Sequence, residues 1–165
     1  MSTYHIPAYD EKTGSGLLRH LYVRTNQAGE SLCCVLCNGK ALPHEAELVK
    51  ALRATEPGLK GVVLGINEKK NNVILGDSYR TLWGEDHLMD TMRGLSFKLS
   101  VPSFYQVNTP QAEVLYDLAL DFAGLTGEET ALDLYCGIGT ITLCLAPMTR
   151  RAFWARHRVM VPMPQ

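Results

Sequence analysis

The sequence has no run of about 20 apolar residues, so no part of it is long enough to cross a bilayer as a helix. Its first residues also lack the basic and then apolar pattern of a secretory signal. An excess of positive charge is missing too: the formal net charge is -1, which argues against binding of nucleic acid by bulk electrostatics. From these absences we expect a cytoplasmic protein that has no membrane partner.

The five cysteines lack the spacing of a structural metal site. Cys34 and Cys37 form a C-x-x-C pair, but a zinc site commonly takes its four ligands from two such pairs, and no second pair exists. Cys33, Cys34 and Cys37 all lie in the apolar run 31–37, which predicts a buried strand. We therefore expect small buried side chains, no metal and no disulfide framework.

The first two thirds of the chain predict an α+β central domain over residues 15–101, after a polar lead-in at 1–14. Apolar alternation and turn residues indicate short strands that form a small antiparallel sheet with one helix. The expected strands are 17–25, 31–37, 61–67, 73–75, 79–83 and 95–99. The helix opens at Pro43 and ends at Pro57-Gly58.

The pattern changes after Pro102. Thr109 and Pro110 supply an N-cap and a first helical residue. The helix carries one apolar face and ends near Gly124. That face consists of Val114, Leu115, Leu118 and Phe122. A strand at 130–134, a glycine loop and a helix from Thr140 follow, so residues 102–146 predict the start of an α/β, Rossmann-like domain.

The glycine loop carries the strongest functional signal. A strand ends in Asp133, and Gly137-Ile-Gly139 then turns the chain into a helix. Two glycines allow the backbone to pass close beneath a ligand. The third glycine of a dinucleotide-binding loop is replaced by Thr142, which disfavours a nicotinamide cofactor. S-adenosylmethionine has no phosphate. Its site therefore needs a backbone that the cofactor can approach closely more than it needs an anion-binding site at the start of the helix.

Two motifs resemble the RNA (uracil-5-)-methyltransferase family, and 23S rRNA enzymes in particular. They are Asp133-Leu-Tyr-Cys-Gly-Ile-Gly139 and Ser103-Phe-Tyr-Gln-Val-Asn108, and the resemblance extends over about residues 8–146. It implies a domain dependent on S-adenosylmethionine, with 23S rRNA as the RNA partner. It also implies that Gln106 and Tyr135 contact the cofactor, that Gly137, Gly139 and Thr140 shape its loop, and that Asp133 orients that loop.

The same resemblance implies that this chain lacks the catalytic residues. In the family a cysteine thiolate adds to C6 of uracil, and a carboxylate base later removes the C5 proton. Both residues belong to the second half of the methyltransferase domain, and the loop residue Cys136 is not the nucleophile. Phe104 and Tyr105 fit either stacking on bases or packing in the core.

Residues 147–165 show no helical or strand period, and we interpret them as an unpatterned tail. The family would continue with a strand ending in an acid that holds the ribose hydroxyls, and no such pair follows Pro147. A truncated or frame-shifted reading frame is the leading hypothesis for this loss of pattern. The alternative is a non-catalytic RNA- or protein-binding module whose glycine loop is vestigial.

Overall fold

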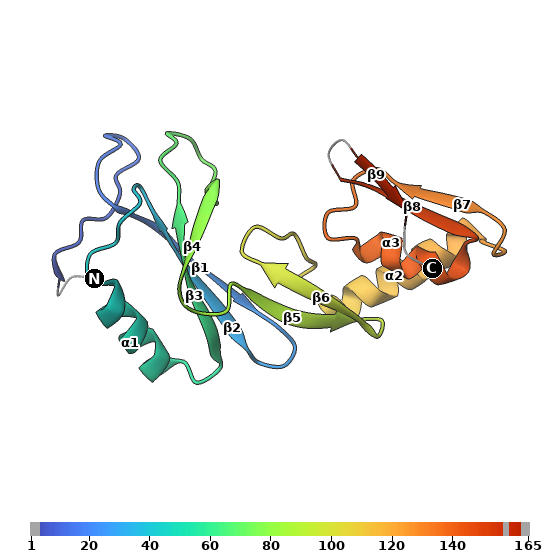
Figure 1. Ribbon diagram of the computed structural model, residues 1–165, viewed down its shortest axis with the longest axis horizontal. Coiled ribbons are helices and arrows are strands. Elements are labelled where there is room, and N and C mark those ends of the chain that lie inside the picture. The colour runs from blue at the N-terminus through green and yellow to red at the C-terminus, as the bar shows by residue number, and fades with distance from the viewer. Residues whose placement is uncertain (1–3, 157–158, 163–165) are drawn as a thin grey trace. The chain divides into compact units, whose positions relative to one another are not determined.

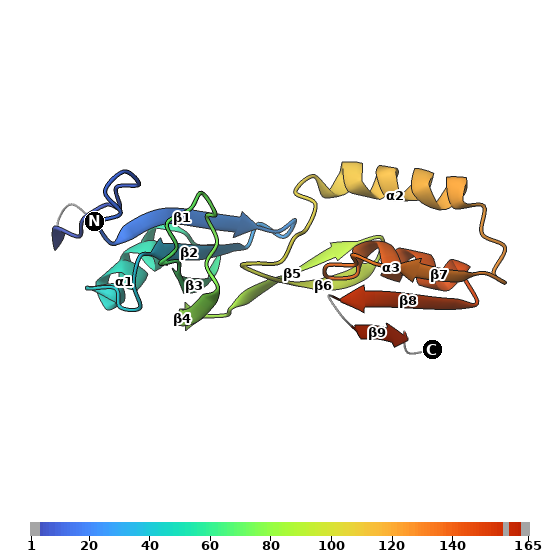
Figure 2. The same cartoon turned by 90° about the horizontal axis from the view of Figure 1, so that it is seen from above.

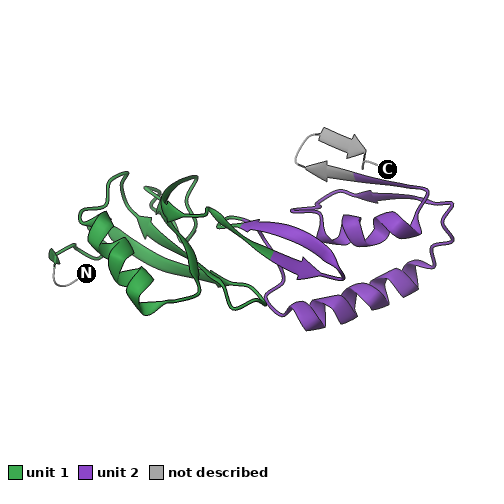
Figure 3. Cartoon of the chain, turned by 60° about the horizontal axis from the view of Figure 1, so that its bottom comes forward, with its two compact units in different colours: residues 1–89, 100–102 green, residues 90–99, 103–165 purple. Residues whose placement is uncertain are grey.

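The computed structural model describes residues 4–156 and 159–162, and the side chains of residues 4–153. The chain divides into two compact units (Figures 1 and 3). Unit 1 comprises residues 1–89 and 100–102, and unit 2 comprises residues 90–99 and 103–165. The sequence placed the boundary at residue 101, whereas the structure groups residues 90–99 with the second unit.

Unit 1 contains a four-stranded sheet in the order β1-β2-β3-β4. The bounds are Leu18–Thr25 for β1, Ser31–Cys37 for β2, Leu59–Ile66 for β3 and Ser78–Gly84 for β4. The pairs β1–β2 and β3–β4 are antiparallel, but β2 and β3 are parallel. The expectation of an antiparallel sheet is therefore wrong for this central pair. Helix α1 (Glu45–Thr55) joins β2 to β3, and a crossover of this kind returns the chain in the same direction.

The core of unit 1 lies on both faces of β2, as the unbroken apolar run predicts. All seven residues of β2 are buried. On one face Val35 and Leu64 pack beneath Leu48 of α1. On the other face Leu36 and Val63 pack with Leu88. The prediction that Cys33, Cys34 and Cys37 are buried strand residues is confirmed.

The loop between β3 and β4 is held by side chains. Residues 73–75 were expected to be a strand, but they have no strand assignment. Instead, the Asn67 amide donates to the carbonyls of Val73 and Ile74 at 2.6 and 3.2 Å. The guanidinium of Arg19 donates to the carbonyls of Asn67, Lys69 and Asn71 at 2.6–3.2 Å. These side chains take the carbonyls that a strand ladder would otherwise use.

The hairpin of β5 (His87–Met92) and β6 (Leu95–Ser100) corrects another expectation. The sequence predicts no strand between residues 83 and 95, whereas β5 lies there. Arg93 and Gly94 both have positive φ, 51° and 74°, as a tight two-residue hairpin turn requires. The turn is tied to helix α2 (Thr109–Ala123), because the Arg93 amide donates to Glu113 and its guanidinium pairs with Asp117.

The remainder of unit 2 is an α/β arrangement. Strand β7 (Thr130–Asp133), helix α3 (Thr140–Leu145) and the short 3-10 helix η2 (Ala146–Met148) lead into β8 (Arg151–Arg156) and β9 (Val159–Pro162). The sheet order is β7-β8-β9, as Figure 2 shows, with β7 parallel and β9 antiparallel to β8. The expected strand, glycine turn and helix are confirmed.

The reading of residues 147–165 as an unpatterned tail differs from this structure. Residues 151–156 and 159–162 are strands, although 157–158 and 163–165 lie outside the described residues. The four apolar residues from Ala152 to Ala155 are flanked by arginines, which is too short a run to give a period. Strand β8 pairs with β7, and the sequence of residues 151–156 alone does not reveal this partner.

Helix α2 occurs where the sequence predicts it, but it buries a different face. The buried residues of its middle and end are Ala112, Tyr116 and Leu120, which are spaced four apart. They pack against Phe97, Leu99 and Cys144. The predicted apolar face is instead exposed: Val114, Leu115, Leu118 and Phe122 are 51%, 56%, 49% and 87% accessible. The helix is therefore apolar on two sides, and the described side chains cover one of them.

Candidate functional site

Five of the six predicted site residues lie on one continuous segment of unit 2. Asp133 ends β7, Tyr135, Gly137 and Gly139 form the turn, and Thr140 begins α3. The turn closes with a hydrogen bond from the Gly139 amide to the Cys136 carbonyl at 2.7 Å. The turn is open to solvent at Tyr135, which is 94% exposed, and at Gly137, whereas Cys136 and Gly139 are buried.

Asp133 fixes the conformation of this turn. One carboxylate oxygen accepts from the Tyr135 amide at 3.2 Å, at the start of the turn. The other accepts from the Thr142 hydroxyl at 2.7 Å, in the first turns of α3. Asp133 therefore ties the strand to the helix across the glycine turn. This arrangement favours an orienting role for Asp133 over direct contact with a ligand.

Thr142 is a site residue whose role the sequence reasoning missed. It is 1% exposed, and its hydroxyl donates a hydrogen bond to the Asp133 carboxylate. The sequence treated it only as the residue that replaces a third glycine. The available signal was the combination of a strand-ending acid with a threonine nine positions later, on the first turns of the helix.

Tyr116 is the second residue that the sequence reasoning missed. Its phenol oxygen lies 3.0 Å from the hydroxyl of Thr140, and the ring is 6% exposed. Thr140 is thereby held by α2, so the start of α3 is fixed from a second element. The spacing of Tyr116 between Ala112 and Leu120 could have indicated a buried tyrosine whose hydroxyl needs a partner.

The two glycines fit a turn that lies beneath a ligand. Gly137 and Gly139 have φ of 58° and 86°, in the region that L side chains rarely adopt. A Cβ added to Gly137 would meet no heavy atom within 4 Å, so the space above it is free.

Gln106 lies outside this segment, on the loop 103–108 of the same unit, and is half-buried. The two aromatic residues that precede it, Phe104 and Tyr105, differ in their exposure. Tyr105 is a core residue, 8% exposed, that packs against Phe97, and burial raises its pKa to about 12. Phe104 is 74% exposed, so of the two aromatic residues only Phe104 can offer a ring to a base.

Burial disfavours the thiolate form of Cys34, Cys37 and Cys144. Among the described residues no three His, Cys, Asp or Glu side chains gather around a possible metal position. Burial raises the pKa of Cys34 to about 12 and that of Cys37 to about 11. Burial also raises the pKa of Cys144. Within residues 4–156 and 159–162, no helix is long and apolar enough to cross a membrane.

Sequence comparison gives strong matches to proteins named uncharacterized RNA methyltransferases. The chain is 44% identical to one from Halalkalibacterium halodurans over 149 residues, which are 90% of this chain and 32% of that protein. It is 44% identical to another from Listeria innocua over 154 residues, or 93% and 34%. This chain therefore spans about a third of the length of these relatives. No protein-family model matches the chain.

Among solved structures, the fold matches a tRNA (uracil-54, C5)-methyltransferase from Pyrococcus abyssi in complex with S-adenosyl-L-homocysteine. The TM-score is 0.69 at 23% identity, covering 88% of this chain and 34% of that one. The likeness at this identity concerns the fold. The resemblance noted from the two sequence motifs is confirmed at the level of RNA methyltransferases: by sequence this chain is a relative of these proteins, homologous to about a third of their length.

Proposed function

We propose that unit 2 carries the S-adenosylmethionine-binding turn of an enzyme that methylates C5 of uracil in RNA, with 23S rRNA as the substrate. The observation that carries this proposal is the turn between β7 and α3, which contains two glycines of positive φ and has free space above Gly137. The similarity to RNA methyltransferases supports the reaction class. The name of the Pyrococcus abyssi protein supports uracil C5 as the methylated atom and a methyl-donor cofactor.

The proposed division of labour follows from the contacts of the turn. Asp133 and Thr142 hold the turn in shape, and Tyr116 holds Thr140 at the start of α3. Gly137 and Gly139 let the cofactor approach the backbone, and Tyr135 and Gln106 are proposed to contact it. The bound cofactor supplies an electrophilic methyl group. Phe104, the exposed ring beside Gln106, is available to stack on the unstacked target base.

We propose that the chain alone does not complete the reaction. A thiolate nucleophile needs an accessible cysteine with a lowered pKa. Cys136, the cysteine of the turn, is 7% exposed, and burial raises the pKa of the other cysteine of unit 2, Cys144. Incubation of the purified chain with radiolabelled S-adenosylmethionine and uracil-containing RNA is expected to give no methylated product. Robust methyl transfer by the chain would contradict this part of the proposal.

The cofactor assignment is tested by calorimetric titration with S-adenosylmethionine. We expect weak binding by the native chain and no measurable binding by Gly137→Val, because the added side chain fills the space above the turn and strains its backbone. Gly124→Val is the matched control. Gly124 has φ of 56°, also has free space around it, and lies at the C-terminus of α2.

The control separates backbone strain from loss of the site. Both substitutions place a β-branched side chain at the same unfavourable φ, so both should lower stability by about 1–2 kcal/mol. Only Gly137→Val should abolish cofactor binding. Equal affinity of the native chain and Gly137→Val would refute the assignment, and so would complete absence of binding to the native chain.

A further inference from the structure

The loop 103–108, which carries Gln106, enters the core of unit 2 through one buried side chain. Among residues 103–108, all of which the structure describes, Tyr105 is the one that is buried, at 8% exposed. Its neighbour Phe104 is 74% exposed, and Val107 is fully exposed. Gln106 follows Tyr105 directly in the chain, so its place depends on where the ring of Tyr105 is held.

The ring of Tyr105 packs in the core beneath helix α2. It lies against Phe97 of β6, with ring centroids 5.9 Å apart and ring planes inclined by 46°. Tilted ring pairs at this separation are favourable beyond the area that they bury. The same buried cluster contains Ala112 and Tyr116 of α2. The position of the loop is therefore set by β6 and α2.

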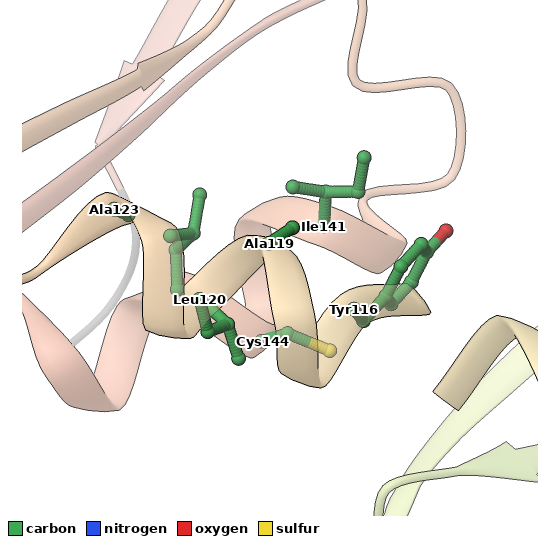
Figure 4. Close-up of a pocket in the computed structure, with 7 residues that line it drawn as sticks. Tyr116, Ala119, Leu120, Ala123, Ile141 and Cys144 are labelled. Carbon is green, nitrogen blue, oxygen red and sulfur yellow. The ribbon is translucent and has the colours of Figure 1, made fainter. Parts of the chain in front are cut away.

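Tyr116 connects this core to the glycine turn. Its phenol oxygen lies 3.0 Å from the Thr140 hydroxyl at the start of α3. Apolar packing between α2 and α3 is incomplete, because a cavity of about 240 Å³ lies between them, and its lining includes Tyr116, Ile141 and Cys144 (Figure 4). Side chains that line a void lose packing contacts, so the polar contact of Tyr116 matters more for the placement of α3. Through Tyr105 and Tyr116, the loop with Gln106 and the start of α3 rest on the same core.

The hydroxyl of Tyr105 takes no part in this anchoring. Its oxygen is buried, and within the described part of the chain no group meets it with hydrogen-bond geometry. Burial and the Asp90 carboxylate raise the pKa of Tyr105, and the Thr109 hydroxyl, which lowers it, lies near without that geometry. A buried donor without a partner costs stability, and phenylalanine would avoid this cost. The ring is therefore the part of the side chain that holds the loop.

We propose that Tyr105 is a positioning residue of the cofactor site: its ring holds Gln106 in a fixed place relative to the glycine turn before the cofactor binds. This inference rests on the proposed function, in which Gln106 and the turn contact the same S-adenosylmethionine molecule. A loop released from the core would have to be ordered when the cofactor binds, and that cost weakens binding. Ordering the backbone of one residue corresponds to about a tenfold change in affinity.

Calorimetric titration with S-adenosylmethionine and limited digestion with chymotrypsin test this role on the same three variants. Tyr105→Ala removes the ring, and Tyr105→Phe keeps it. Met92→Ala is the matched control, because Met92 is fully buried in the same cluster but lies beside the turn of the β5–β6 hairpin, at the opposite end of β6 from the loop. Thermal unfolding defines a temperature at which all variants are folded, and both assays are run there.

We expect Tyr105→Ala to bind S-adenosylmethionine about tenfold more weakly than the native chain. Without cofactor, the fragment that ends at the exposed Phe104 should form about tenfold faster in this variant, because the loop opens more often. Tyr105→Phe should match the native chain in both assays, and Met92→Ala should lose stability without either change. If Tyr105→Ala fails to fold, Tyr105→Leu takes its place, since leucine stays apolar but loses the ring contact with Phe97.

Native affinity or a native rate of cleavage in the variant without the ring overturns the inference. An equal loss of affinity in Met92→Ala does so too, because it would indicate a purely structural role for Tyr105. In each of these cases the native chain still binds the cofactor, so the proposed function stands. A native chain that does not bind S-adenosylmethionine refutes the proposed function, and this inference falls with it.

Discussion

Replacing Thr142 with valine tests whether the contact with Asp133 fixes the candidate cofactor turn. Valine keeps the shape of the side chain and removes the hydroxyl, which donates to the carboxylate at 2.7 Å. Thr142 is 1% exposed, whereas Asp133 is only half-buried, so water can replace part of the lost interaction. Hydrogen bonds to charged groups contribute about 1.5–3 kcal/mol, and we expect a loss near the lower figure.

We expect this loss of stability in the segment around the turn. Because the chain has two compact units, a single unfolding transition of the whole chain would combine the stabilities of both units and hide a local change. Amide hydrogen exchange of residues 130–145 resolves the segment directly. A loss of about 1.4 kcal/mol corresponds to a tenfold rise in exchange rate, so the Thr142→Val segment should exchange about tenfold faster. Affinity for S-adenosylmethionine should fall in parallel, because a looser turn must be ordered on binding.

Thr140→Val provides the comparison. Its hydroxyl bonds the neutral phenol of Tyr116 at 3.0 Å, and a neutral hydrogen bond contributes about 0.5–1.5 kcal/mol. The exchange rate should therefore rise less than in Thr142→Val. Exchange in Thr142→Val at the native rate, or a larger effect of Thr140→Val, would refute the idea that Asp133 organises the turn.

Two further predictions concern titratable groups. Hydrogen bonds from the Thr126 hydroxyl and from the amides of Thr126 and Gly127 lower the pKa of Glu129 to about 2, from its ordinary value of 4.5. This contribution to stability is complete above pH 4.5 and is lost as the pH falls toward 2, so the protection of the amides before β7, measured relative to their intrinsic exchange rate at each pH, should fall in that window, and Glu129→Gln should remove the dependence. Cys34 and Cys37, with pKa values of about 12 and 11, should resist iodoacetamide at pH 8 until the chain is denatured; rapid labelling of the folded chain would contradict their burial.

The strand, glycine turn and helix of unit 2 were predictable because their signals are local. Asp133 ends the strand, and Gly137 and Gly139 mark positions of positive φ that few other residues adopt. Helix α2 was predictable for a similar reason, through Pro110 at its start, but its N-cap is Asn108, whose side chain accepts from the Gln111 amide, and not Thr109 as the sequence indicates.

The features that the sequence did not reveal depend on contacts between distant residues. The parallel pairing of β2 with β3 follows from the path of α1, which no strand pattern encodes. Strand β8 forms because β7 offers an edge, and its own four apolar residues are too few to indicate it. On α2, periodicity indicated the apolar face of Val114, Leu115, Leu118 and Phe122 and missed the face of Ala112, Tyr116 and Leu120 that packs in the structure. That outcome depends on Phe97 and Cys144, residues far apart in sequence.

The β3–β4 loop of unit 1 shows how a long connection can keep one shape while its sequence changes. Arg19 and Asn67 bind main-chain oxygens, which every residue type possesses. Substitutions at Lys69, Asn71 or Val73 therefore leave the acceptors in place, whereas an ammonium at position 19 could not span three carbonyls in the plane of a guanidinium. Among related proteins, we expect variation to concentrate on the outward side chains of this loop and to spare its two anchors.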